Sequence, residues 1–135
     1  MKQFSCLCLL LLLAFTQASG QQNNKKVMTQ QTLIDRFIVP QPAIDTFMQR
    51  VNYNRNFIKK LPGFIHDAAY QRRDEKGNLI FVTVAVWENE TVISNAKAAV
   101  QAEYRKIGFN MPQFLEQAGI IIERGIYEEV EEKGQ

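Results

Sequence analysis

The chain is poor in the residues that build covalent and metal-centred sites. It has two cysteines, Cys6 and Cys8, and a single histidine, His66, among 135 residues. Both cysteines lie in an N-terminal segment that we expect to be removed, so the remaining protein would have no disulfide, thiolate metal site or cysteine nucleophile. One histidine without cysteine ligands does not make a zinc site. The sequence therefore predicts no bound metal, and stability that comes from core burial and association.

Neither sign of charge dominates, because 16 Lys and Arg stand against 14 Asp and Glu. Removal of an N-terminal segment that includes Lys2 would lower the formal net charge from +2 to +1. So small a charge does not steer binding to a polyanion. A glycine-rich phosphate-binding loop is also missing from the sequence. We therefore predict no nucleic-acid partner and no cofactor.

The first twenty residues differ in composition from the rest. Lys2 precedes an apolar run from Leu7 to Phe15 that includes five consecutive leucines, and small residues occupy positions 18–20. This order is typical of a secretory signal peptide, and the run is too short for a permanent membrane span. We predict that residues 1–20 are cleaved, that the protein is secreted or periplasmic, and that it has no membrane contact after cleavage.

The stretch from Leu79 to Trp87 is the most apolar part of the remaining chain, with eight apolar residues in nine. Its β-branched residues suit a pleated strand. A strand with one wet face alternates apolar and polar residues, and this stretch does not. It therefore predicts a strand covered on both faces, around which the fold is organised.

Strand and helix signals alternate around this stretch. Residues 21–31 predict a flexible leader, and residues 131–135 an acidic tail. We predict strands at Thr32–Val39, Phe64–Arg72, Leu79–Trp87 and Ile120–Val130, long helices at Pro42–Leu61 and Glu88–Ile107, and a short helical turn at Pro112–Ala118. Asn89 is expected to cap the second long helix, and Gly125 to mark a β-bulge in the last strand.

The order strand, helix, strand, strand, helix, strand is the ferredoxin-like split βαβ pattern. It predicts one α+β domain over residues 32–130, with a four-stranded antiparallel sheet and two helices on one face. We assign Phe81, Ala85 and Trp87 to the uncovered face, which would leave an apolar patch in water. A second copy would cover it, giving a homodimer in the form of a dimeric α+β barrel with a cavity between the two sheets.

Three segments flank the predicted helices. They read Phe37-Ile38-Val39-Pro40 before the first helix, Leu61-Pro62-Gly63-Phe64 after it, and Val84-Ala85-Val86-Trp87-Glu88-Asn89 at the strand-to-helix junction. These segments resemble the antibiotic biosynthesis monooxygenase domain family. The resemblance extends from about Thr32 to Val130 and implies a dimeric α+β barrel. The family includes cofactor-independent oxygenases of aromatic polyketides and quinols, haem-degrading enzymes, and members without a known activity.

The resemblance implies that Trp87 bounds a cavity for an aromatic substrate, and the alternative is a packing role in the core or the dimer interface. Thr83 stands four positions before it, where the oxygenases have an amide side chain. The haem-degrading branch uses a histidine on the second helix, which has none here, and an asparagine on the first strand, where this chain has Asp35. The departure at Asp35 and the missing histidine argue against haem degradation.

The predicted site combines substrate-binding residues with one base. We predict Trp87, Thr83, Arg36 and Tyr70 as substrate-binding, and His66 as catalytic because an imidazole titrates near neutrality. Because side chains alternate along a strand, His66 is expected on the same face as Phe64, Ala68 and Tyr70. The alternative for His66 is a structural or exposed histidine. Asp35 and Arg36 are either in an ion pair or at an edge position near solvent, or they are polar groups that point into a ligand cavity.

Two functions follow from these expectations. The first is an exported homodimer that binds a small aromatic or quinone-like compound in the cavity between the sheets, with cofactor-independent monooxygenase activity. The second is a non-catalytic ligand-binding or structural dimer of the same fold. An enclosed pocket lined by Trp87 and at least two polar groups favours the first, and a filled interface favours the second.

Overall fold

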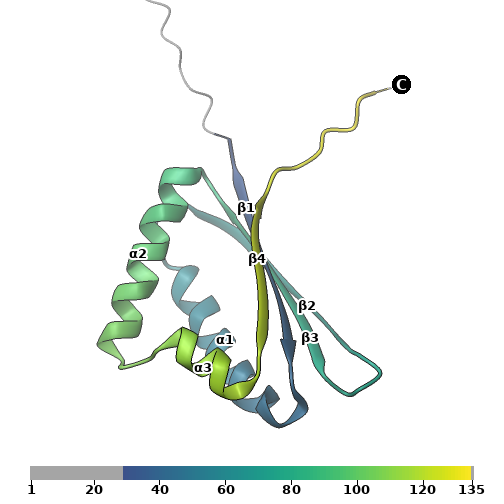
Figure 1. The fold of residues 1–135 in the computed structure, drawn as a ribbon. Helices are drawn as coiled ribbons and strands as arrows, with labels where there is room; N and C mark the ends of the chain where they lie inside the picture. The colour runs from purple at the N-terminus through teal and green to yellow at the C-terminus, as the bar shows by residue number, and fades with distance from the viewer. Residues whose placement is uncertain (1–28, 135) are drawn as a thin grey trace, which may run out of the picture.

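The computed structural model describes residues 29–134, so the predicted signal peptide and most of the predicted leader lie outside the described residues. The elements are β1 (Gln31–Val39), η1 (Gln41–Ala43), α1 (Ile44–Ile58), β2 (Phe64–Arg73), β3 (Leu79–Trp87), α2 (Glu90–Lys106), α3 (Met111–Ala118) and β4 (Ile121–Tyr127). The predicted order of strands and long helices is confirmed, and the short helical turn is α3 (Figure 1).

The four strands form one antiparallel sheet in the order β2-β3-β1-β4. β3 pairs with β1 on one side and with β2 on the other, from Leu79 to Trp87. It therefore has no free edge and carries the apolar side chains of both faces. This is the organising strand that its composition predicts.

The helices lie on one face of the sheet (Figure 1). Phe37, Leu79 and Phe81 of the central strands are buried against Phe47 of α1 in the larger core cluster. A second cluster joins Ala85, Trp87 and Ala96 of α2. The assignment of Phe81, Ala85 and Trp87 to the uncovered face is therefore wrong. The two-residue period of a strand shows which residues share a face, but not which face the helices cover.

Within residues 29–134 no helix covers the opposite face of the sheet, which is also apolar. Alternation along β1 and β3 gives it Ile34, Ile38, Val82, Val84 and Val86. Each of these registers with a β2 or β4 residue of the same face. At its margins Tyr70 is 63% exposed and Ile121 is 62% exposed. We call this surface the open face. An apolar face without helices was predicted, and only its residues differ.

The predicted bulge at Gly125 is wrong, because β4 passes Gly125 opposite Ile34 without a shift of register. The irregularity lies instead in β2, between Phe64 and His66. One extra residue at a bulge reverses the parity of the strand beyond it. Phe64 thus stands opposite Trp87 on the helix-covered face, while His66 stands opposite Val86 on the open face.

Local signals set the ends of two elements. The Asn89 side chain accepts a hydrogen bond from the backbone N–H of Val92 at 3.0 Å, which confirms the predicted cap of α2. In the β2–β3 hairpin, Asp74 accepts hydrogen bonds from the Asn78 side chain and from backbone N–H groups, and these hold the pKa of Asp74 below its usual value. Among helices of residues 29–134, none is long and apolar enough to cross a bilayer.

Gly63→Ala is expected to lower the free energy of unfolding by about 2 kcal/mol, from overpacking and a strained backbone. Gly63 has a φ of +76°, and a Cβ there would lie 2.3 Å from Cγ1 of Val92. Gly108→Ala is the matched control, because its φ is +67° but no atom lies within 4 Å of the added carbon. Urea denaturation should show the larger loss for Gly63→Ala, and equal losses would contradict the predicted clash with α2.

Candidate functional site

A partly open cavity of about 970 Å³ lies between the sheet and the helices. Residues of all four strands, of α1, α2 and the first turn of α3, and of the segment between α2 and α3 line it. Its aromatic lining residues are Phe37, Phe47, Trp87, Tyr104, Phe109 and Phe114. The cavity therefore forms within one chain, on the helix-covered face, and not between two sheets as the sequence predicts.

Polar side chains from three adjacent strands form a row across the floor of this cavity. Thr83 of β3 stands opposite Asp35 of β1, and Asp35 stands opposite Arg124 of β4. Residues directly opposite in antiparallel strands bring their side chains together on one face. All three residues line the cavity. We call them the polar row.

Arg124 and Asp35 make a bidentate ion pair within the polar row. The Nε and one Nη of Arg124 donate to the two carboxylate oxygens of Asp35 at 2.6 and 2.7 Å. The hydrogen bond to Asp35 raises the pKa of Arg124, so its guanidinium is charged at every ordinary pH. The two predicted alternatives for Asp35, an ion pair and a cavity group, are therefore both realised.

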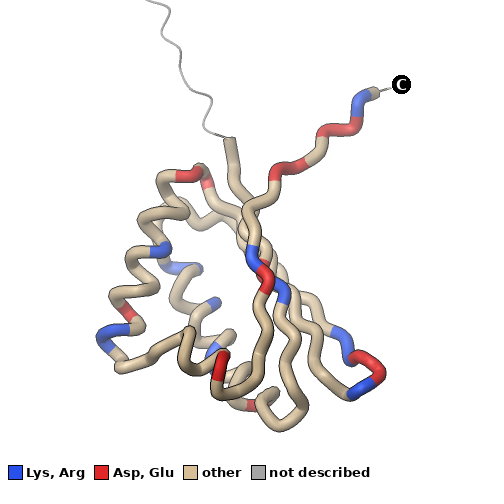
Figure 2. The backbone as a smooth tube through the Cα atoms, viewed as in Figure 1, with Lys and Arg blue, Asp and Glu red and all other residues tan. Residues whose placement is uncertain are grey.

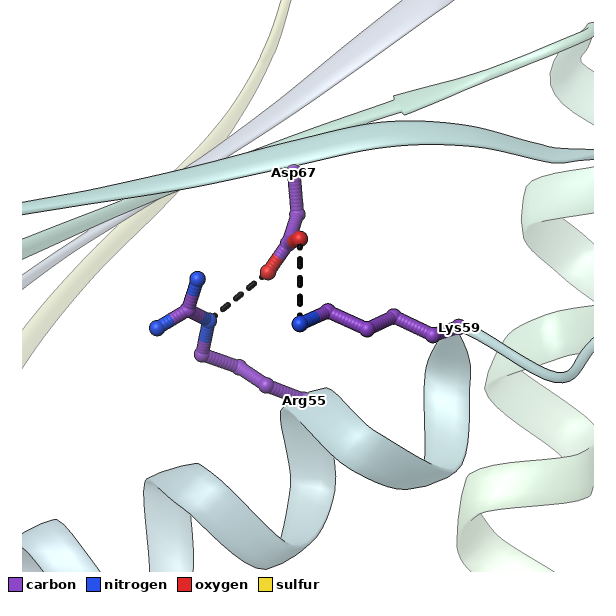
Figure 3. Close-up of polar contacts among 3 residues, drawn as sticks. All are labelled: Arg55, Lys59 and Asp67. Atoms are coloured by element: carbon purple, nitrogen blue, oxygen red, sulfur yellow. Dashed lines mark hydrogen bonds and ion pairs between the residues drawn. The ribbon is translucent and has the colours of Figure 1, made fainter.

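A second ion pair joins Arg55 of α1 to Asp67 of β2 (Figure 3). Both of these residues line the cavity. The Nε of Arg55 donates to one oxygen of Asp67 at 2.7 Å, and the Nζ of Lys59 lies 3.6 Å from the other oxygen. Arg55 lies in the last turn of α1 and Lys59 is the C-cap residue one turn later, so both side chains reach the same carboxylate. Asp67 is thereby neutralised, and the end of α1 is tied to the edge strand.

The wall opposite the sheet is built from α1, α2 and the segment after α2. The Tyr104 hydroxyl donates to Oδ1 of Asn54 at 3.2 Å, and burial raises the pKa of Tyr104, which keeps that hydroxyl protonated. The Tyr104 ring meets Phe109 edge to face at 5.1 Å. The guanidinium carbon of Arg50 lies over the Phe109 ring, 4.3 Å from the ring centroid. This cation–π contact fixes a positive charge beside an aromatic wall.

Trp87 is both a core residue and a wall of the cavity. Its side chain is 3% exposed and meets Phe64 edge to face at 5.5 Å. Within residues 29–134 its indole Nε1 is buried without a hydrogen-bond partner. Thr83 lies four residues earlier on the same face of β3, so these two predicted site residues do come together.

The other predicted site residues lie on the open face, away from the cavity. Nη1 of Arg36 lies 3.8 Å from Oε2 of Glu123 in β4, and both side chains are exposed on that face. Tyr70 and His66 of β2 are both exposed there. Consecutive residues of a strand point to opposite faces, so Arg36 cannot join its neighbour Asp35. The structure therefore splits the predicted set between two faces.

Several cavity residues were not among the predicted site residues. Asp35 and Arg124 carry a readable signal, since each is a charged residue in a largely apolar strand. Asp35 also lies on the same strand face as the buried Phe37. Arg50, Asn54 and Tyr104 carry none, because their contribution depends on how α1 and α2 dock on the sheet. Within residues 29–134, no group of three or more His, Cys, Asp or Glu side chains is arranged to hold a metal ion.

The fold is similar to several solved structures. A candidate monooxygenase from Shewanella loihica superposes with a TM-score of 0.59 at 21% identity, over 78% of this chain and 98% of that chain. SnoaB, a cofactor-independent oxygenase from Streptomyces nogalater, gives a TM-score of 0.53 at 22% identity, over 79% and 99%.

A dimeric ferredoxin-like protein from an uncultured marine organism gives a TM-score of 0.52 at 13% identity, over 75% of this chain and 98% of that chain. No protein-family model and no curated protein matches the sequence. The chain therefore has the ferredoxin-like α+β fold of antibiotic biosynthesis monooxygenase domains.

Proposed function

We propose that the protein binds a small aromatic or quinone-like compound in the cavity between the helices and the sheet, and oxidises it as a cofactor-independent monooxygenase. The observation that carries the proposal is the meeting of aromatic walls with the polar row of Thr83, Asp35 and Arg124. Cavities that hold small molecules are mostly apolar, with a few polar groups that fix orientation. A volume of about 970 Å³ is at the upper end of their usual range.

The polar row matches the needs of a quinol. A quinol reacts by losing a proton, which the Asp35 carboxylate can accept, and by developing negative charge on oxygen, which Arg124 and the Thr83 hydroxyl can stabilise. The quinol itself supplies all four electrons that reduce O₂. One oxygen atom forms the new hydroxyl of a hydroxyquinone, and the other leaves as water. No external reductant is required.

The non-catalytic alternative is supported by a separate observation. The lining carboxylates and the buried phenol already have partners: Asp35 with Arg124, Asp67 with Arg55, and Tyr104 with Asn54. Thr83 also provides a hydroxyl where the similar oxygenases have an amide. A cavity whose polar groups satisfy one another can hold a ligand without changing it.

Oxygen uptake separates the two functions. With purified protein lacking residues 1–20, we expect a quinol panel to include a compound whose oxidation consumes O₂ and forms a hydroxyquinone. Thr83→Val should slow that turnover about tenfold or more, by removing one hydrogen bond to the developing oxyanion. His66→Ala is the control and should turn over normally, since His66 lies on the open face. Saturable binding without any uptake would establish the non-catalytic function.

The proposal includes a homodimer formed through the open face. The apolar patch there has the character of an interface, and dimerisation would bury exposed Tyr70 and Ile121. Sedimentation velocity at micromolar concentration should show a dimer, and Val84→Glu should give a monomer by placing a charge at the centre of the patch. Ser94→Glu, an exposed position on α2, should leave the dimer intact. A wild-type monomer would exclude this assembly.

Export completes the proposal. Its support is the sequence of residues 1–20, with an apolar run followed by small residues at the expected cleavage position. Protein recovered from outside the cytoplasm of the native host should begin near Gln21. An intact mass that includes Met1 to Gly20 would refute cleavage.

A further inference from the structure

Cationic residues are concentrated around the cavity. Residues 29–134 carry 13 Lys and Arg against 14 Asp and Glu, because three of the 16 basic residues precede position 29. The cavity lining, in contrast, has five cationic residues and only two acidic ones. Acidic residues gather instead in the C-terminal tail, where the tube in Figure 2 is mostly red. The lining is positive although the described chain as a whole is not.

Both lining carboxylates are already neutralised within the protein. Asp35 is held by Arg124, and Asp67 by Arg55 and Lys59. Three lining cations then remain: Arg50, Lys97 and Arg105. Within the described residues, none of these three has a carboxylate within 4.0 Å. Their charges are not used to hold the fold together by ion pairs.

The three cations come from two helices and face one cavity. Lys97 and Arg105 are eight residues apart on α2, with Gln101 midway between them, so the three side chains form one row along the helix. Lys97, Gln101 and Arg105 all line the cavity. Arg50 stands on α1, held against Phe109 by its cation–π contact. All three cations are exposed, whereas the aromatic residues Trp87 and Phe37 are buried. The cavity thus has aromatic walls, the polar row on its floor, and a positive rim.

This distribution of charge specifies one end of the ligand. An apolar ring would enter between Trp87 and the other aromatic walls, and an anionic group on it would remain at the rim. Arginine binds a carboxylate with two parallel hydrogen bonds, and it does so better than lysine, whose ammonium acts as a point charge. We infer that the ligand of this cavity is an aromatic carboxylate, with its ring inside and its carboxylate held by Arg50, Lys97 and Arg105. The inference rests on the proposed function and names the substrate class.

A matched pair of probes tests the inference. 2-Naphthoate and 2-naphthamide share one ring system and differ in charge. Calorimetric titration of both therefore separates the affinity that comes from the aromatic walls from the affinity that comes from the cationic rim. We expect the acid to bind at least about tenfold more tightly than the amide at low salt, and the difference to shrink as added salt screens the exposed rim.

Charge variants then locate the effect. Arg50→Gln, Lys97→Gln and Arg105→Gln should each weaken binding of the acid about threefold or more while leaving the amide unchanged. Arg50→Lys keeps the charge and should retain the preference for the acid. Lys106→Gln is the control, since Lys106 neighbours Arg105 on α2 but does not line the cavity.

The outcomes are distinct. Equal affinity for acid and amide, or no effect of the three glutamine variants in proteins with an unchanged melting temperature, would overturn the inference and leave the proposed function standing. Failure of both probes and of the quinol panel to bind would overturn the proposed function, and the inference with it.

Discussion

Trp87→Ala is expected to lower the free energy of unfolding by about 3 to 5 kcal/mol, the usual loss when a buried large aromatic side chain is truncated. Trp87 is 3% exposed, and its ring packs against Phe64, Ala85 and Ala96. These contacts join β3, the start of β2 and α2, so the substitution opens a void where three elements meet. Chemical denaturation followed by circular dichroism measures the loss, because the chain has no other tryptophan to report by fluorescence.

The same substitution should also abolish binding of an aromatic ligand, since the ring borders the cavity. Trp87→Phe is the control: it keeps an aromatic ring against Phe64 and removes the unpaired indole N–H, so its loss of stability should be less than half as large. A loss of under about 1 kcal/mol for Trp87→Ala would show that the ring is a cavity wall without a core role.

Arg124→Gln is expected to destabilise the protein by about 2 to 3 kcal/mol, because it leaves the Asp35 carboxylate buried without its cation. The side chain of Asp35 is 11% exposed, whereas that of Arg124 is 53% exposed. The half-exposed guanidinium recovers hydration when its partner is lost, and the buried carboxylate does not. Asp35→Asn should therefore cost less, about 1 kcal/mol, and this asymmetry is the specific expectation.

A double-mutant cycle checks this pair. Asp35→Asn combined with Arg124→Gln removes both charges, so the double variant should be more stable than Arg124→Gln alone. Urea denaturation at neutral pH gives all four free energies of unfolding. Additive losses would show that the two hydrogen bonds at 2.6 and 2.7 Å do not couple the residues energetically.

The two variants also separate stability from function. Asp35→Asn keeps the shape of the polar row but loses the proposed base, so quinol turnover should fall while ligand binding persists. Arg124→Gln should weaken both, because the guanidinium holds Asp35 in place and provides charge to a developing oxyanion. Loss of turnover in neither variant would remove Asp35 from the proposed mechanism.

Local patterns in the sequence determined the elements of this fold. The apolar run from Leu79 to Trp87, the Pro62-Gly63 turn and the Asn89 cap each act over a few residues, and each lies where it was predicted. The order of the elements then fixed the ferredoxin-like topology, because few connections of four strands and two helices avoid crossing. Half of the strand ends lie at the predicted residue and the others differ by at most three residues, as at Tyr127, where pairing with β1 stops.

Only the tertiary structure decided which face of the sheet carries the site. The side chains on both faces of β3 are apolar, so hydrophobicity could not distinguish the face under the helices from the open face. The sequence therefore predicted the cavity on the wrong face of the sheet. The irregularity between Phe64 and His66 reversed the parity of β2 without a local sequence signal. Arg50, Lys97 and Arg105 line one cavity because two helices dock side by side on the sheet, and such docking depends on packing between residues that are distant along the chain.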